Sequence, residues 1–394
     1  MPRLTVTAKR LNKRKQIPLH FPDPNGIIGE VLKGFTFEGF EVGEAQIPNK
    51  SLGRWFKDRD GHFYWGGGLE EAMGLRTFQP VTVEVPPDTE EVPPSVDFSK
   101  MSWGHRFCEI PFIWNDLATK GKGATVAVID TGVDEVHEDL VTNLHPESRS
   151  FAGQVVTDTD GHGTTMAGII GASGKSKVFG VAPECSLLII KATPQVSGVD
   201  VHVFANAINF AASVPDVDIV SISYSFVEDN TILKEAVQNC LDANKIVVAA
   251  IGNGHIFDSG DDDRFPACYN NGVSDIRGVL SIGAFDSAGL LCSFSNWNRH
   301  LHFLAPGDLS VLTTGIGNQV VNGAGTSIAT AFTAGCLALM ISYTKLHNPG
   351  KTKDCVQHLL STCDDIGPTV GIDLSSGNGR MNFRNAVSKI KIVS

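Results

Sequence analysis

Short, mostly apolar runs alternate with segments of helical spacing over the last three quarters of the chain. Apolar runs of this length favour strands that are buried on both faces of a parallel sheet. They occupy residues 126–129, 187–191, 219–225 and 246–250. Helices are predicted over residues 166–172, 201–212, 232–244 and 330–340. This alternation predicts an α/β fold with a mostly parallel sheet.

The first 79 residues follow a different pattern, with short strands and frequent turns. Residues 4–7 alternate in polarity as a strand does. Residues 54–57 and 62–65, joined through Asp60-Gly61, predict a β-hairpin. We therefore expect a separate small all-β domain at residues 1–79, which resembles an SH3-like barrel.

Three aromatic residues of this first domain leave two interpretations open. Trp55, Tyr64 and Trp65 either line a ligand groove or fill the core of a small barrel. Residues 80–102 are predicted to be a linker, because five prolines enforce extended backbone there and acidic residues keep it solvated. The third segment, residues 103–394, then holds the α/β domain.

Composition narrows the class of protein. The 394 residues carry a formal charge of −11, which argues against nucleic acid as the main partner. The sequence shows no run of about 18 apolar residues, so we expect no membrane span. The first twenty residues lack the apolar core of a secretory signal. The eight cysteines are scattered without a CxxC pair, which favours buried thiols in a reducing, cytoplasmic compartment.

Three polar residues occupy positions suited to catalysis. Asp130 ends the strand at residues 126–129, His162 precedes a predicted helix, and Ser327 stands where the glycine-rich turn Gly323-Ala324-Gly325 meets another. A serine needs a base to remove its proton, and the base needs an acid to orient it. A helix N-terminus also favours developing negative charge. The three residues therefore predict nucleophilic catalysis.

The motifs around these residues resemble those of subtilisin-like (S8 family) serine proteases. The matching stretches are Asp130-Thr131-Gly132-Val133-Asp134, His162-Gly163-Thr164-x-x-Ala167-Gly168 and Gly325-Thr326-Ser327-Ile328-Ala329. Their order Asp…His…Ser is that of subtilisin. The resemblance implies a doubly wound sheet and a serine endopeptidase that acts on polypeptides. It assigns Asp130, His162 and Ser327 to the catalytic triad.

Further matches imply other site residues. Val247-Val248-Ala249-Ala250-Ile251-Gly252-Asn253 ends at the asparagine of the family's oxyanion hole. By the same resemblance, Ser223, Tyr224 and Ser225 bind the substrate backbone, with Gly252 beside them. Most members have glycine where Ser225 stands, which narrows the expected pocket. The sequence departs from the family at two further positions: Thr165 stands where many members have a histidine, and Ala331 where a proline is usual. Neither position takes part in the proton transfers, so an active enzyme is still expected.

Arg264 falls at the base of the S1 pocket in this resemblance, where glycine is frequent. Three interpretations of it stay open. A buried guanidinium selects Asp or Glu at P1, because a carboxylate supplies its missing partner. Alternatively, the neighbouring Asp261, Asp262 and Asp263 already pair with it, or they face the pocket themselves and favour a basic P1 residue.

The resemblance also raises the question of a structural calcium ion. Asp139 matches a calcium ligand of many family members, but residues 173–179, which would complete the site, contain two lysines and no carboxylate. Calcium prefers oxygen ligands and negative charge. We therefore expect no metal and no other cofactor.

Two other classes of function are considered. The chain could be a catalytically silent scaffold with a protease fold, or a module whose SH3-like domain is the working part. A fluorophosphonate probe separates them, since only an activated serine is labelled. For an active protease inside the cell we expect restraint by the first domain or by the linker, which would then answer to a regulatory ligand or partner.

Overall fold

The computed structural model describes two parts of the chain. In the N-terminal part it describes seven strands between residues 3 and 71. In the rest it describes residues 97–392 except 255–262, 273, 276, 309–310, 349–351, 353 and 368–369. The chain divides into two compact units between residues 84 and 85.

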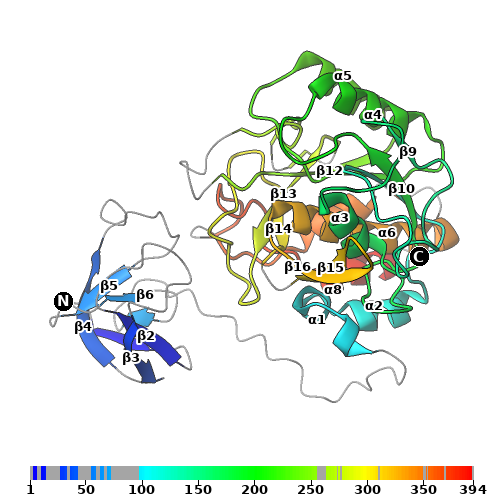
Figure 1. The fold of residues 1–394 in the computed structure, drawn as a ribbon. Helices are drawn as coiled ribbons and strands as arrows, with labels where there is room; N and C mark the ends of the chain where they lie inside the picture. Colours follow the sequence, from blue (N-terminus) through cyan, green and yellow to red (C-terminus); the bar gives the residue numbers. More distant parts are fainter. Residues whose placement is uncertain are drawn as a thin grey trace. The chain divides into compact units, whose positions relative to one another are not determined.

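The N-terminal unit contains an antiparallel sheet of seven strands in the order β3-β2-β6-β5-β4-β1-β7 (Figure 1). The strands are β1 Arg3–Val6, β2 Arg10–Arg14, β3 Ile27–Leu32, β4 Thr36–Val42, β5 Trp55–Asp58, β6 Phe63–Trp65 and β7 Leu69–Glu71. The predicted hairpin is confirmed, because β5 and β6 pair antiparallel with Trp55 opposite Trp65. The likeness to an SH3 barrel stays a prediction. The side chains of Trp55, Tyr64 and Trp65 lie outside the described residues.

The second unit is built on a parallel sheet of seven strands in the order β14-β13-β12-β11-β8-β10-β9. The strands are β8 Thr125–Asp130, β9 Arg149–Ser150, β10 Ser186–Lys191, β11 Ile219–Ile222, β12 Ile246–Ala250, β13 Leu280–Phe285 and β14 Phe303–Pro306. The central strands are almost entirely buried, as their apolar sequences predict. A separate ribbon pairs β15 Val311–Gly315 with β16 Gln319–Gly323.

Helices cover both faces of this sheet (Figure 1). They are α1 Trp103–Phe107, α2 Ile110–Leu117, α3 His162–Gly171, α4 Val201–Ser213, α5 Thr231–Asp242, α6 Thr326–His347, α7 Asp354–Ser361 and α8 Phe383–Ile392. α4 and α5 pack against each other on one face, whereas α6 packs against α3 and five of the strands on the other. The predicted α/β architecture is therefore confirmed for this unit.

Three predicted element boundaries are wrong. α3 begins at His162 and not at residue 166. α6 begins at Thr326, at the predicted junction of turn and helix around Ser327, but it continues to His347, beyond the apolar run that ends at residue 340. Both helices start directly after a glycine with positive φ, Gly161 or Gly325, which lets the chain turn sharply into the helix. β11 ends at Ile222, so residues 223–225 leave the strand. His162 and Ser327 therefore both lie in the first turn of a helix, and residues 223–225 follow directly after a strand.

The structure describes the second unit from Asp97 onward, and its first residues fall within the segment predicted to be linker. Phe98–Lys100 form a 3₁₀ helix that Asp97 caps through its side chain. Met101 and Ser102 are buried, and the Lys100 carbonyl accepts from the backbone of Phe179. Residues 97–102 therefore belong to the packed unit, and the predicted boundary at residue 103 lies too late.

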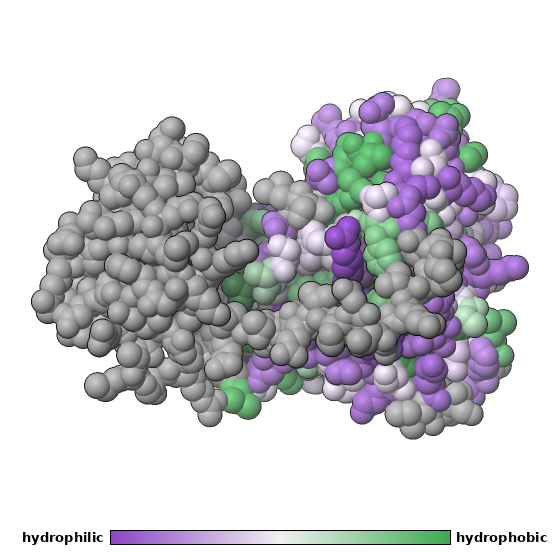
Figure 2. Space-filling view, turned by 90° about the horizontal axis from the view of Figure 1, so that it is seen from below, coloured by the Kyte–Doolittle hydropathy of each residue, from purple (hydrophilic) through white to green (hydrophobic). Residues whose placement is uncertain are grey.

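α6 is apolar and long enough to span a membrane, which the sequence interpretation overlooked. Among the helices of the described residues, only α6 combines this length with this apolar character, and its mean hydropathy is 1.4. Its apolar window is wholly buried inside the fold, where it packs against the sheet. The described surface seen in Figure 2 mixes hydrophilic and hydrophobic residues. α6 thus serves as the central helix of the unit's core.

Candidate active site

Asp130 and His162 form a hydrogen-bonded pair at the carboxyl end of β8. His162 Nδ1 lies 2.8 Å from Asp130 Oδ1 and 3.0 Å from Oδ2. The Asp130 side chain is only 3% exposed, whereas that of His162 is 24% exposed. The backbone N–H of Thr131 donates to Asp130 Oδ1 at 2.8 Å and fixes the carboxylate. This geometry holds one nitrogen of the ring and leaves Nε2 for another partner.

Two opposing effects set the pKa of His162. Burial lowers this pKa, but the negative charge and hydrogen bond of Asp130 outweigh burial and raise it above the ordinary value of 6.5. The carboxylates of Asp160 and Asp158 add smaller contributions in the same direction. A group with a raised pKa holds its proton to higher pH. The site therefore stabilises the imidazolium form of His162.

Asp158 anchors the first turn of α3, a role that sequence reasoning missed. Its Oδ1 accepts from the hydroxyl of Thr131 and from the backbone of Gly161, and its Oδ2 accepts from the backbone and hydroxyl of Thr164. Burial raises the pKa of Asp158, but these hydrogen bonds prevail and hold it below the ordinary value. The carboxylate thereby ties the end of β8 to the start of α3, on which His162 sits.

Ser327 is the second residue of α6. Its Oγ donates to the carbonyl of Ser223 at 3.0 Å, and Ser223 Oγ donates back to the Ser327 carbonyl at the same distance. Gly325 precedes the helix with φ of +141°, and a Cβ there would lie 3.3 Å from Asn253 Nδ2. The serine is thus held at the helix N-terminus, where the dipole favours an anion.

Asn253 lies in the turn after β12 and is exposed. Its Oδ1 accepts from both the backbone N–H and the hydroxyl of Thr326, each at 2.9 Å. None of the hydrogen bonds given for the described residues uses Nδ2, and the residue is exposed. Thr326, another residue that sequence reasoning missed, therefore orients Asn253 as a donor.

Asn296 supports the same turn from below. This fully buried residue accepts from the Gly254 N–H at 2.7 Å and donates to the Ile251 carbonyl at 3.3 Å. Gly252 has φ of +104°, and a Cβ on it would lie 2.8 Å from Asn296 Nδ2. A larger residue at position 252 would push against Asn296. The hydrogen bonds of Asn296 therefore hold the turn that carries Asn253 in one conformation.

The residues predicted to bind substrate backbone follow directly after β11. Within the described part of the chain, the loop hydrogen bonds include none to the backbone of Tyr224 or Ser225. Tyr224 packs against Phe204 and Phe226, and burial raises its pKa. A segment at the end of a strand whose backbone groups are not paired can receive another strand.

Arg264 lies beside the turn that carries Asn253. A Cβ on Gly254 would come within 3.2 Å of Arg264 Nη2, and Nη1 donates to the Asp263 carbonyl at 3.2 Å. Arg264 is partly buried. Asp261 and Asp262 lie outside the described residues. The three interpretations of the P1 preference stay open.

The surroundings of Asp139 do not fit a calcium ion. Its fully buried carboxylate accepts from the backbone N–H groups of Ser176, Lys177 and Val178 at 2.7, 2.7 and 3.0 Å. The Lys177 ammonium donates to the carbonyl of Asn318. Calcium needs six to eight oxygen ligands. The Asp139 oxygens already accept hydrogen bonds from backbone N–H groups, and these groups take the place of further oxygen ligands. We therefore assign no calcium site to Asp139.

A histidine–aspartate pair and a serine at a helix N-terminus, all on a parallel α/β sheet, are features that serine hydrolases also have. The chain belongs to the subtilase family, which it matches over residues 121–379. It is 36% identical to an intracellular serine protease of Paenibacillus polymyxa over 60% of this chain and 72% of that one. It is 34% identical to the major intracellular serine protease of Bacillus subtilis over 63% and 77%, and 31% identical to subtilisin Savinase of Lederbergia lenta over 68% and 93%.

These similarities establish the general activity. The chain is a subtilisin-like serine endopeptidase, and its substrates are polypeptides.

Proposed function

We propose that this endopeptidase cleaves peptide bonds through the triad Asp130, His162 and Ser327 and a covalent acyl-enzyme. Ser327 Oγ attacks the carbonyl carbon of the substrate, and its proton passes to His162 Nε2. The same proton then goes to the leaving amine. Water hydrolyses the acyl-enzyme by the reverse sequence, and Asp130 stabilises the imidazolium throughout.

The observation that carries this proposal is the bond between His162 Nδ1 and the buried Asp130. It fixes the tautomer whose free Nε2 accepts a proton, as a general base must. The Ser327 hydroxyl, which donates to Ser223 in the free protein, needs only a rotation about χ1 to leave that carbonyl. Catalytic hydrogen bonds often tighten only when substrate is bound.

The oxyanion of the tetrahedral intermediate is proposed to bind two donors. One is the Asn253 side-chain amide, oriented by Thr326, and the other is the Ser327 backbone N–H at the start of α6. The substrate backbone would pair with residues 223–225, and Gly252 would let it approach closely. The interpretations of Arg264 imply different P1 preferences, which a peptide library profiled with the wild type and Arg264→Gly distinguishes.

Asn253→Ala is expected to lower kcat by about 10²–10³-fold and to leave KM nearly unchanged. The donor acts on charge that develops only in the transition state, so its loss weakens transition-state binding alone. Steady-state kinetics with a chromogenic peptide measure both constants. Gln238→Ala, on the exposed side of α5, is the control and should change neither. An unchanged kcat in a folded Asn253→Ala protein contradicts the oxyanion role.

Cytoplasmic location is the second part of the proposal. Two of the relatives are named intracellular proteases. All eight cysteines are free thiols, seven of them buried, as expected for a reducing compartment.

A protease that shares a compartment with the cell's own proteins needs restraint. We assign this restraint to the N-terminal unit or to the acidic linker, under control of a ligand or partner.

Removal of residues 1–96 is expected to raise kcat/KM for a short generic peptide, because the restraint that we assign to this segment would be lost. The truncation stops at residue 96, since residues 97–102 pack into the peptidase unit. The comparison uses full-length and truncated protein at equal active-site concentration, with thermal unfolding as a folding check. Equal turnover by a folded truncation would instead assign a docking role to the N-terminal unit.

A further inference from the structure

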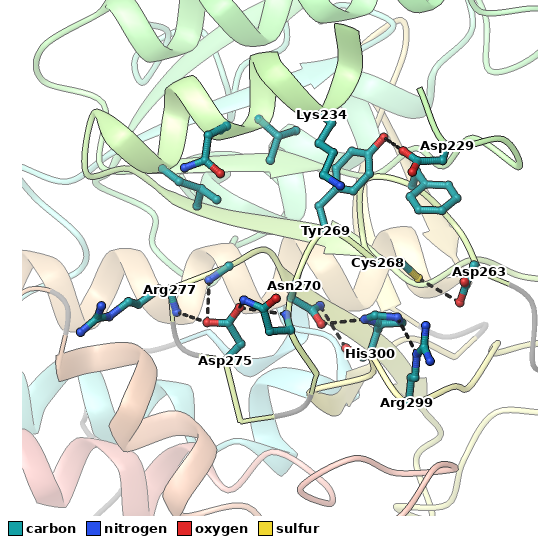
Figure 3. A pocket seen from close by; sticks show the side chains of 16 residues that line it. Asp229, Lys234, Asp263, Cys268, Tyr269, Asn270, Asp275, Arg277, Arg299 and His300 are labelled. Carbon is teal, nitrogen blue, oxygen red and sulfur yellow. Dashed lines mark hydrogen bonds between the residues drawn. The ribbon is translucent and has the colours of Figure 1, made fainter. Parts of the chain in front are cut away.

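A second cluster of chemically active side chains lies beside Arg264. One ligand atom each from Asp263, Cys268 and His300 lies within 4.8 Å of the other two. Cys268 and His300 are buried, whereas Asp263 is exposed. The three residues contribute to the wall of a polar pocket of about 520 Å³ (Figure 3). The cluster therefore joins a sulfur, a nitrogen and a carboxylate oxygen, and it is open to solvent on one side.

The hydrogen bonds of His300 decide which of its nitrogens is available. Arg299 Nε can only donate, and it lies 3.1 Å from His300 Nε2, so Nε2 carries a lone pair. Nδ1 then carries the proton and donates to Asn270 Oδ1 at 2.9 Å. Metal-binding histidines in proteins characteristically donate their other N–H to a carbonyl or carboxylate oxygen.

The sulfur of Cys268 is surrounded by donors. The backbone N–H of Arg264 lies 3.3 Å from Sγ, and Asn298 Nδ2 lies 3.5 Å from it. The thiol itself donates to Asp263 Oδ1 at 3.7 Å. A metal ion binds the thiolate and not the thiol, so an incoming cation would replace the proton of this bond. The two N–H donors would stabilise the thiolate that a metal requires.

We propose that Asp263, Cys268 and His300 bind one divalent transition-metal ion of the Zn²⁺ class. Tetrahedral zinc with bonds of 2.0–2.3 Å places its ligand atoms about 3.3–3.8 Å apart, close to the present S···O separation of 3.7 Å. On binding, the Cys268 thiol loses its proton to solvent and sulfur bonds to the metal. Thiolate and carboxylate then balance the ion's charge, and a water molecule fills the fourth position.

Arg299 controls access to this site. Its guanidinium occupies the lone pair of His300 Nε2 that the ion needs, and its positive charge opposes a cation. The residue is exposed, so its side chain can swing into solvent when an ion enters. Because the Arg264 N–H contacts Cys268 Sγ, a bound ion would also stiffen the segment that carries Arg264.

Cobalt titration of the full chain tests the proposal. The inactive Ser327→Ala protein is used as background to prevent self-cleavage, and Co²⁺ reports thiolate ligation through its sulfur-to-metal charge-transfer absorption. We expect the band to saturate at one ion per chain and Zn²⁺ to bleach it. Cys268→Ser should abolish the band, whereas Cys363→Ser, which lies outside both the proposed ligand set and the triad, should keep it. No band, or a band that survives Cys268→Ser, overturns the proposal.

Two further variants keep the test independent of the folding of Cys268→Ser. Loss of an outer-shell partner alone weakens metal binding by roughly 10–100-fold, so loss of the ligand in His300→Gln should weaken Zn²⁺ at least as much. Arg299→Gln should bind Zn²⁺ more tightly, because it removes the competing cation. Calorimetry in two buffers should also show release of one proton per ion. Equal affinity in all three proteins would exclude this ligand set.

Discussion

Ser327→Ala is expected to lower kcat on the order of 10⁶-fold, the loss that removal of the nucleophile causes in subtilisin. The acyl-enzyme cannot form without the hydroxyl, and only the oxyanion donors and binding then accelerate hydrolysis by water. The fold should persist, because Ser327 loses one hydrogen bond to Ser223 while α6 stays buried in the core. A chromogenic peptide assay and thermal unfolding measure the two properties.

A fluorophosphonate probe gives the same prediction a covalent readout. It should label the wild type once and Ser327→Ala not at all. Ser223→Ala is the matched control, because Ser223 exchanges hydrogen bonds with Ser327 but is assigned no proton transfer. It should keep the label. A wild type that resists the probe would favour the silent-scaffold interpretation, and activity retained by Ser327→Ala would refute the triad.

Asp130→Asn is expected to lower kcat by about 10⁴-fold and to shift the pH dependence. kcat/KM falls as pH drops through the pKa of His162, because the imidazolium cannot accept the serine proton. Asp130 raises that pKa above 6.5 through its charge and hydrogen bond. Without this charge the pKa falls, so the acid limb of the profile should move to lower pH. The profile of kcat/KM between pH 4 and pH 9 measures the shift.

Asp160→Asn is the control for charge alone. Asp160 is exposed and raises the pKa of His162 less than Asp130 does, but its carboxylate accepts from the His162 backbone and not from the ring. The variant should therefore show a smaller shift in the same direction and keep most of its kcat. If the acid limb of the kcat/KM profile did not shift in Asp130→Asn, a group other than His162 would be responsible for that limb.

The strands of the sheet could be predicted from the sequence because the pattern that identifies each strand lies within the strand itself. Each buried strand is an apolar run bounded by glycine or polar residues, and its hydrogen-bond partners need not be known to recognise it. The same holds for α4 and α5, whose Asp200 and Asn230 caps come just before their first turns. The start of α3 at His162 was predicted too late because Gly161 and Gly163 are typical of a loop.

The site was predictable in part, for a related reason. Asp130, His162, Asn253 and Ser327 each lie in a short motif at the end of an element, so sequence alone identifies them as candidates. The residues that orient them were missed, because Asp158, Thr326 and Asn296 act across loops. An ordinary polar residue in a loop carries no local signal of the partner that it will meet.

What the sequence by itself determined is the class of fold and the candidate residues of the reaction. Tertiary structure decided the rest: that Thr326 orients the Asn253 amide, that backbone N–H groups occupy the carboxylate of Asp139, and that Cys268 meets His300. Periodicity records contacts within an element, whose geometry repeats along the chain. Contacts between loops depend on how the elements pack, and packing exists only once the whole core has formed.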